Sequence, residues 1–173
     1  DQANLLTDQE EQSLNTKLRE ISERQQVDVA IMTVNSIPEG YSVRGYADTV
    51  YEDSGYGYGA NKDGLMLLIS MEDHDWYITT MGYGITAFTD AGIQYIGDQI
   101  TTDLAAKSYA KAFETYANLC DEFITQAKSG NPYDVSDLRA MQPLAKKWIF
   151  ISIGIGLVIG ICVVSGMSAK MKT

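Results

Sequence analysis

Carboxylate side chains flank the glycine-rich segment 55–64, which is the part of the sequence best suited to hold a metal ion. Asp63 lies near the end of this segment, Asp53 precedes it, and Asp90 follows the next two apolar runs. Hard cations such as Ca²⁺ bind about six to eight oxygen atoms of carboxylates, backbone carbonyls and water. The three aspartates therefore predict a divalent-cation site, most simply for Ca²⁺. The alternative is that Asp90 only caps a helix, Asp63 only shapes a turn and Asp53 is solvated.

Tyrosine side chains are concentrated around the same segment. Tyr56 and Tyr58 lie within it together with Asn61, and Tyr83 follows the second of the two apolar runs. Tyrosines on glycine-rich loops provide large, adaptable contact surfaces, so these four residues predict a partner-binding loop. Tyrosines that merely cover the edge of a sheet would give the same pattern, and the sequence leaves both interpretations open.

Two other patterns resemble ligand sites but lack the residues that would complete them. Asp73-His74-Asp75 contains the only histidine of the chain, and without a second histidine or a nearby cysteine it is more typical of an exposed turn than of a zinc site. Gly55, Gly57 and Gly59 precede Lys62 and lead from a helix into a strand. Phosphate-binding loops lead from a strand into a helix, so we expect no nucleotide site here.

The candidate site residues must be positioned by helices and strands, and the sequence indicates where these elements begin and end. Thr7 and Glu10 form a capping box at the start of the first helix. The predicted elements are helix 8–24, strand 27–34, helix 41–53, strands 65–71 and 76–81, a helix that Thr89 or Asp90 caps and that continues to Leu104, and helix 109–127. A helix between the first two strands makes them parallel, and a tight turn makes the third strand antiparallel to the second. We therefore predict an α/β fold in which helices cover a small mixed sheet, plus one C-terminal transmembrane helix.

The transmembrane prediction rests on residues 148–169, which contain no charged side chain and have lysines at both ends. About 20 apolar residues in a helix span a hydrocarbon core of about 30 Å. We predict a transmembrane helix at 146–169, with residues 148–167 in the bilayer. Gly156 and Gly160 form a G-x-x-x-G pattern, which is compatible with weak homodimer formation or with the ordinary frequency of glycine in membrane helices.

The part of the chain that precedes this helix is strongly acidic. Nine of the 13 basic residues but all 23 acidic residues precede residue 146, which gives that part a net charge of −14. Nucleic-acid binding requires a basic surface, and the sequence offers none. An acidic domain is instead suited to divalent cations or to a basic partner.

The chain is expected to have four parts, of which the first two lie outside the cytoplasm. They are a domain at 1–130, a juxtamembrane tether at 131–145, the membrane helix at 146–169 and the start of a cytoplasmic tail at 170–173. We expect a cleaved signal peptide upstream, and hence a domain on the outer side of the plasma membrane or cell envelope. Cys120 falls in the domain and Cys162 in the membrane, so they are not expected to form a disulfide.

Several short motifs, taken in order, resemble the TPM-domain family. They are Asp1-x-Ala-x-Leu-Leu-Thr7, VDVAIMTV at 27–34, Asn61-Lys-Asp-Gly64, and Gly82-Tyr-Gly84 before Thr89-Asp-Ala91. That family includes thylakoid-lumen proteins linked to photosystem II repair, a nematode modulator of acetylcholine receptors and bacterial envelope proteins. The resemblance covers about residues 1–130 and implies an α/β/α sandwich outside the cytoplasm. Family members are described variously as phosphatases, calcium binders and assembly or receptor accessories.

The leading functional hypothesis is a non-enzymatic, membrane-anchored module that binds a divalent cation and assists a membrane protein or complex. The alternative, which the resemblance permits, is a metal-assisted phosphatase of low specificity. The chain contains no Cys-x5-Arg, Asp-x-Asp-x-Thr or Arg-His-Gly motif. A domain so acidic would need a metal ion to stabilise a phosphoryl dianion.

Overall fold

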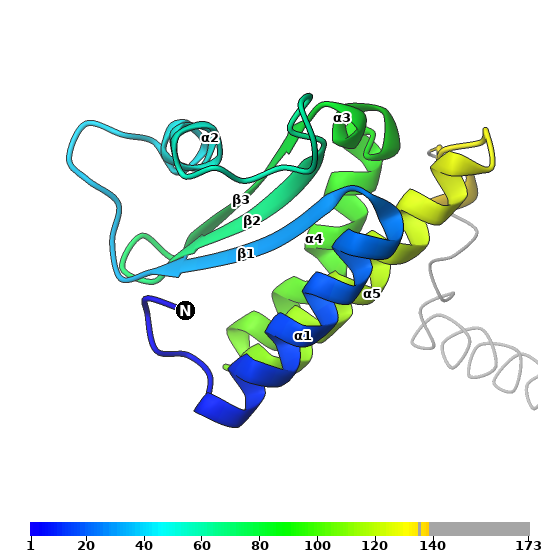
Figure 1. The fold of residues 1–173 in the computed structure, drawn as a ribbon. Coiled ribbons are helices and arrows are strands. Elements are labelled where there is room, and N and C mark those ends of the chain that lie inside the picture. The colour runs from blue at the N-terminus through cyan, green and yellow to red at the C-terminus, as the bar shows by residue number, and fades with distance from the viewer. Residues whose placement is uncertain (135, 139–173) are drawn as a thin grey trace, which may run out of the picture. The chain divides into compact units, whose positions relative to one another are not determined.

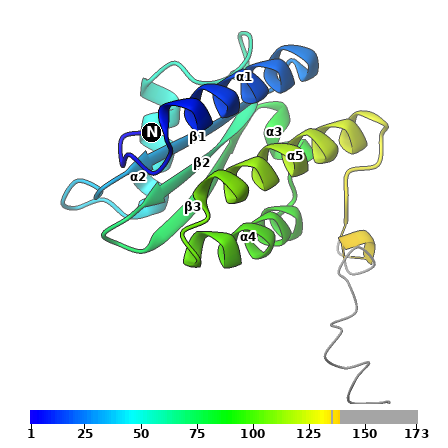
Figure 2. The same cartoon turned by 90° about the horizontal axis from the view of Figure 1, so that it is seen from below.

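The computed structural model describes residues 1–134 and 136–138 (Figures 1 and 2). Three strands form a sheet in the order β1-β2-β3. Strand β1 (Asp28–Val34) is parallel to β2 (Gly64–Ser70), and β2 is antiparallel to β3 (Asp75–Met81). Helix α2 (Val43–Asp53) covers one face of the sheet, and the long helices lie on the other face (Figures 1 and 2). The predicted α/β fold with a small mixed sheet is confirmed.

Strand β2 is the centre of the fold. All seven of its residues are buried, because it has a strand on each side and helices over both faces. Met66 and Leu68 pack toward α2 in a cluster with Ala47 and Tyr51. On the opposite face, α5 (Tyr109–Lys128) buries an apolar stripe. Its members include Phe113, Tyr116, Cys120, Phe123 and Ile124. The apolar runs of the sequence therefore meet in one core.

Side-chain caps determine where two of the helices begin. Helix α1 (Asp8–Gln25) starts at the predicted capping box, in which Glu10 N donates to Thr7 Oγ1 at 3.3 Å and Thr7 N donates to Glu10 Oε2 at 2.9 Å. Helix α2 begins at Val43, two residues later than expected. Ser42 Oγ accepts a hydrogen bond from Gly45 N at 3.1 Å, and this cap places Tyr41 outside the helix.

Helix α4 (Asp90–Ala105) also starts at a predicted cap, since Thr89 Oγ1 accepts a hydrogen bond from Gly92 N at 3.1 Å. Its buried face differs from the expected stripe. Tyr95, Ile96 and Ile100 are buried, whereas Ile93 and Leu104 are only half-buried. The helix packs closely against Trp76 of β3 at Gly97, which has no side chain. A Cβ atom at this position would lie 2.2 Å from the indole ring. The short helix α3 (Tyr83–Ala87) was not predicted.

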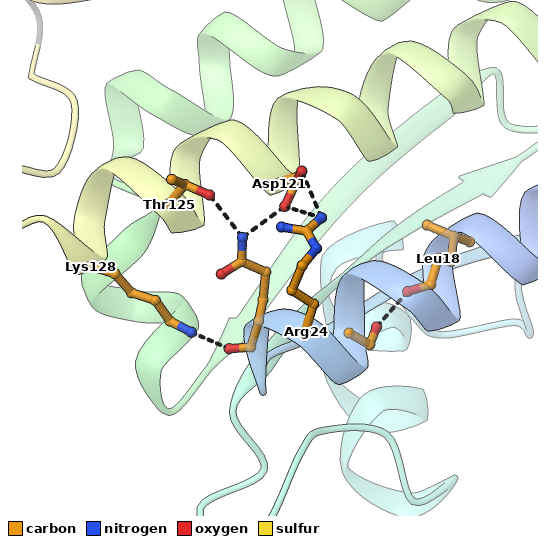
Figure 3. Close-up of polar contacts among 7 residues, drawn as sticks. Leu18, Arg24, Asp121, Thr125 and Lys128 are labelled. Carbon is orange, nitrogen blue, oxygen red and sulfur yellow. Dashed lines mark hydrogen bonds and ion pairs between the residues drawn. The ribbon is translucent and has the colours of Figure 1, made fainter.

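A set of polar contacts joins the C-terminal end of α1 to α5 (Figure 3). Gln25 Nε2 donates to Asp121 Oδ1 at 2.7 Å and to Thr125 Oγ1 at 2.8 Å. Arg24 forms an ion pair with Asp121 at 2.9 Å, and Lys128 Nζ donates to the Gln25 carbonyl. These contacts fix the turn that leads from α1 into β1.

The predicted transmembrane helix at 146–169 lies outside the described residues, and so do Gly156, Gly160 and Cys162. Within residues 1–134 and 136–138, no helix is long and apolar enough to cross a membrane. The start of the expected tether is described. There the ring of Tyr133 packs edge-on against Phe123, with the ring centroids 4.9 Å apart.

Candidate functional site

Asp63 lies at the end of the glycine-rich loop, one residue before β2. Its backbone pairs with Tyr58: Tyr58 N donates to the Asp63 carbonyl at 2.9 Å, and Asp63 N donates to the Tyr58 carbonyl at 3.0 Å. The same Asp63 carbonyl also accepts a hydrogen bond from Asp28 N at 2.9 Å. The backbone of Asp63 is therefore fixed at the point where β1 and β2 both begin.

The Asp63 carboxylate faces the turn between β3 and α3. Its Oδ1 accepts a hydrogen bond from Tyr83 N at 2.6 Å. Gly82 makes this approach sterically possible, because a Cβ atom there would lie 2.1 Å from Asp63 Oδ1 and 2.9 Å from the Asn61 carbonyl oxygen. Gly82 also has φ of +56°, a conformation that side chains with a Cβ rarely adopt. Two oxygen atoms, one from Asp63 and one from Asn61, thus lie together over Gly82.

This pair of oxygens provides part of the coordination that a hard cation needs. Within the part of the chain that the structure describes, no three Asp, Glu, His or Cys side chains gather as metal ligands. Asp53 is exposed at the end of α2 and Asp90 is exposed in the first turn of α4, so the three aspartates do not form one cluster. Asp63 and the Asn61 carbonyl would leave about four to six positions to water, which suits a weakly held, hydrated cation.

Two tyrosines, Tyr51 and Tyr56, anchor the loop between α2 and β2. The ring of Tyr51 stacks on that of Tyr56 with centroids 5.9 Å apart, and Tyr51 Oη donates to the Lys62 carbonyl at 3.1 Å. Burial raises the pKa of Tyr51 far above its ordinary value, and the charges of Asp28 and Asp63 raise it further. Tyr51 is therefore a neutral hydrogen-bond donor that holds the loop in place.

Asp28 is a site residue that the sequence analysis did not identify. Its Oδ2 accepts a hydrogen bond from Gly57 N at 2.8 Å, so it ties the glycine-rich loop to the start of β1. The signal that could have revealed it is a carboxylate between Val27 and Val29 at the start of a β-branched run. Lys62 is a further anchor, because its Nζ donates to the Glu52 carbonyl at 2.6 Å.

The predicted partner-binding residues lie on and around this loop with different exposure. Tyr58 is 40% exposed and Asn61 is exposed, whereas Tyr56 and Tyr83 are half-buried. Ile85, which the sequence analysis did not identify, is 62% exposed on α3. The residues around the Asp63 carboxylate are here called the loop–α3 surface, which consists of Tyr58, Asn61, Asp63, Tyr83 and Ile85.

His74 lies at the opposite end of β2 and β3, in the turn that joins them. It is exposed, it has φ of +51°, and its Nδ1 is 3.0 Å from the Glu72 carbonyl oxygen. Among the described residues no zinc-type cluster forms around it. Its placement matches the exposed turn expected from the sequence.

Comparison with known proteins gives both a family and a fold. The family model of the TPM domain matches residues 1–123. The structure is similar to the N-terminal domain of a protein from P. gingivalis, with a TM-score of 0.58 and 21% identity over 76% of this chain and 83% of that one. It is also similar to the BA42 protein from the psychrophilic bacterium Bizionia argentinensis, with a TM-score of 0.55 and 14% identity over 76% and 88% of the two chains. At these identities the structural likeness establishes the fold alone. No curated protein sequence matches the chain.

Proposed function

The chain belongs to the TPM domain family, and from this premise we propose that it is a membrane-anchored, extracytoplasmic binding module. It binds a divalent cation at Asp63 and assists another membrane protein or complex. The observation that carries the proposal is the loop–α3 surface. There the exposed Tyr58 pairs through its backbone with Asp63, and the exposed Ile85 lies two residues after Tyr83, whose N–H holds the Asp63 carboxylate.

The composition of this surface favours contact with another protein. Protein interfaces combine aromatic or aliphatic anchors with a few polar groups whose orientation is fixed. Tyr58 and Ile85 supply the anchors, and Asp63 supplies the polar group. A cation bound at Asp63 keeps coordination positions for outside oxygen atoms, so a carboxylate of the partner could complete its shell. The cation would then connect the two proteins.

The membrane anchor in this proposal rests on the sequence. Residues 148–169 carry no charged side chain, and such a length is sufficient to span a bilayer. The acidic part before residue 146 would be repelled by anionic lipid headgroups. We therefore expect the domain to contact its partner in solution near the membrane and not the lipid surface itself.

Calorimetric titration of Ca²⁺ into the full chain in detergent tests the proposed cation site. Asp63→Asn should abolish the heat of binding, whereas Asp73→Asn, in the turn at the opposite end of β2, should leave it unchanged. Bound Ca²⁺ should also raise the melting temperature, because a ligand at about one hundred times its Kd stabilises the folded state by about 2.7 kcal/mol. If NaCl of matched ionic strength gives the same shift, or if the two variants behave alike, Asp63 holds no cation.

A further inference from the structure

Strand β1 is one of the two edge strands of the sheet, β3 being the other, and α1 lies below β1 (Figure 1). In a parallel pair of strands, every second residue directs its N–H and C=O groups toward the neighbouring strand, and the residues between direct theirs away. Asp28 N donates to the Asp63 carbonyl and the Val34 carbonyl accepts from Met71 N, so the even-numbered residues of β1 face β2. The outward-facing peptide groups belong to Val29, Ile31 and Thr33.

The protein covers both ends of this outer edge but not its middle. At one end, Val29 N donates to Ser22 Oγ of α1 at 3.0 Å. At the other, the Thr33 carbonyl accepts a hydrogen bond from Gln2 N at 3.1 Å. No hydrogen bond from any other described residue reaches the N–H or C=O of Ile31 at this edge. An open peptide group on an edge strand is a template for pairing with another strand.

The open position lies in a groove. A cavity of about 380 Å³ runs along the edge of β1 between α1 and the glycine-rich loop, with Arg19 on one wall and Tyr56 on the other. A smaller cavity of 30 Å³ continues past Ile31 toward Glu11. The room for a short extended chain therefore lies on the Asp28 side of Ile31, since 30 Å³ is about the volume of one water molecule.

We propose that the outer edge of β1 at Ile31 is a strand-addition site for an extended, basic peptide segment of a partner protein. Added strands gain their affinity from main-chain hydrogen bonds, and Gln2 already makes one such bond to this edge. The groove shares Asp28 and Tyr56 with the base of the glycine-rich loop, but it does not include Asp63 and does not depend on a bound cation.

Charge selects the occupant. Asp28 and Glu11 line the groove, with Glu11 in an ion pair with the N-terminal amine of Asp1 at 3.1 Å, and Arg19 is the one basic side chain that lines it within the described part of the chain. The part of the chain before residue 146 has a net charge of −14, so a second copy would be repelled whereas a lysine- or arginine-rich segment would be attracted.

Binding of a defined peptide to the full chain in detergent tests this site. The probe is a fluorescent six-residue peptide of alternating lysine and valine, and its first control carries glutamate in place of lysine. The second control keeps all the side chains but is N-methylated at every residue, so that it loses the backbone donors of both edges. We expect the lysine peptide to bind, the glutamate peptide not to bind, and N-methylation to weaken binding about tenfold or more, because two or more hydrogen bonds are lost.

Hydrogen exchange and variants locate the bound peptide. The amide of Ile31 should exchange more slowly when the lysine peptide is bound. Ile31→Pro removes this outward N–H, which an edge strand tolerates, and should weaken binding about tenfold, with circular dichroism as the check on folding. Ile85→Ser on the loop–α3 surface should leave peptide binding unchanged.

Three outcomes would overturn the proposal. The first is equal binding of the N-methylated and unmodified peptides to the wild-type chain, which would mean that charge alone attracts them. The second is loss of peptide binding in Ile85→Ser with no protection of the Ile31 amide, which would place the contact on the loop–α3 surface. The third is a dimer in sedimentation with Ile31 protected in the absence of peptide, which would identify a second copy as the occupant.

Discussion

Replacement of Gly82 by alanine tests whether Asp63 is positioned as the structure indicates. The new Cβ atom would lie 2.1 Å from Asp63 Oδ1, so the carboxylate must move and its hydrogen bond with Tyr83 N must break. Loss of a hydrogen bond to a charged group costs about 1.5–3 kcal/mol. The backbone at φ of +56° and ψ of −125° is essentially confined to glycine and costs an alanine roughly 1–3 kcal/mol more. Since the carboxylate is half-buried, we expect a total loss of about 2–5 kcal/mol in the free energy of unfolding.

Gly59 provides the matched control for this measurement. It also has a positive φ, of +66°, but a Cβ atom there would have nothing within 4 Å. Gly59→Ala should therefore cost only the conformational part, roughly 1–2 kcal/mol. The entropy that alanine removes from the unfolded chain is the same in both variants and cancels in the comparison.

Urea unfolding of a fragment of residues 1–145, followed by fluorescence and circular dichroism, measures both changes. We expect this fragment to fold alone, because the family match ends at residue 123 and α5 ends at Lys128. Gly82→Ala should also weaken Ca²⁺ binding, whereas Gly59→Ala should not. Equal destabilisation by the two variants would refute the close approach of Asp63 to Gly82.

Three further predictions follow from other parts of the domain. Burial raises the pKa of Asp121, but the hydrogen bonds from Arg24 and Gln25 outweigh this effect and hold the pKa below its ordinary value. The stability that Asp121 contributes is therefore fully present above its unfolded pKa of about 3.9. It is lost as the pH falls through the lower pKa of the folded state. Asp121→Asn should flatten the loss of stability below about pH 4, and a melting series that is unchanged from wild type would contradict this. Burial raises the pKa of the Cys120 thiol far above its usual range, so in fragment 1–145 it should react with a thiol reagent only after urea is added, and rapid labelling of the folded fragment would show that α5 opens. The same fragment should not hydrolyse a chromogenic phosphate ester with or without Ca²⁺ or Mg²⁺, and metal-dependent turnover would favour the phosphatase alternative.

Local signals in the sequence were sufficient to predict most of the elements. The capping box at Thr7 and Glu10 and the cap at Thr89 each act within three residues, so their effect can be read from neighbouring letters. The continuous apolar run of β2 predicted a central strand because only a strand covered on both faces can bury every side chain. Helix α3 was not predicted, because its five residues, which include Gly84 and Ala87, are too few to show a helical period of apolar side chains.

The composition of the candidate site was less predictable than its location. The sequence placed Asp63 at the correct end of the sheet, because antiparallel pairing of β2 with β3 brings Gly64 opposite Met81. It did not predict that Asp53 and Asp90 would stay exposed and apart, since that depends on how α2 and α4 pack against the sheet.

Other features depend on tertiary structure because they join residues far apart in the chain. Asp28 secures Gly57 only once β1 lies beside β2, and Gly82 matters because the β3–α3 turn closes onto Asp63. The open edge at Ile31 results from strand order and from which peptide groups face outward, and periodicity alone does not reveal either. The sequence by itself thus determined the strands, all the helices but α3, and the acidic charge, whereas long-range pairing decided which carboxylate is held over a glycine and which peptide group of the β1 edge remains open.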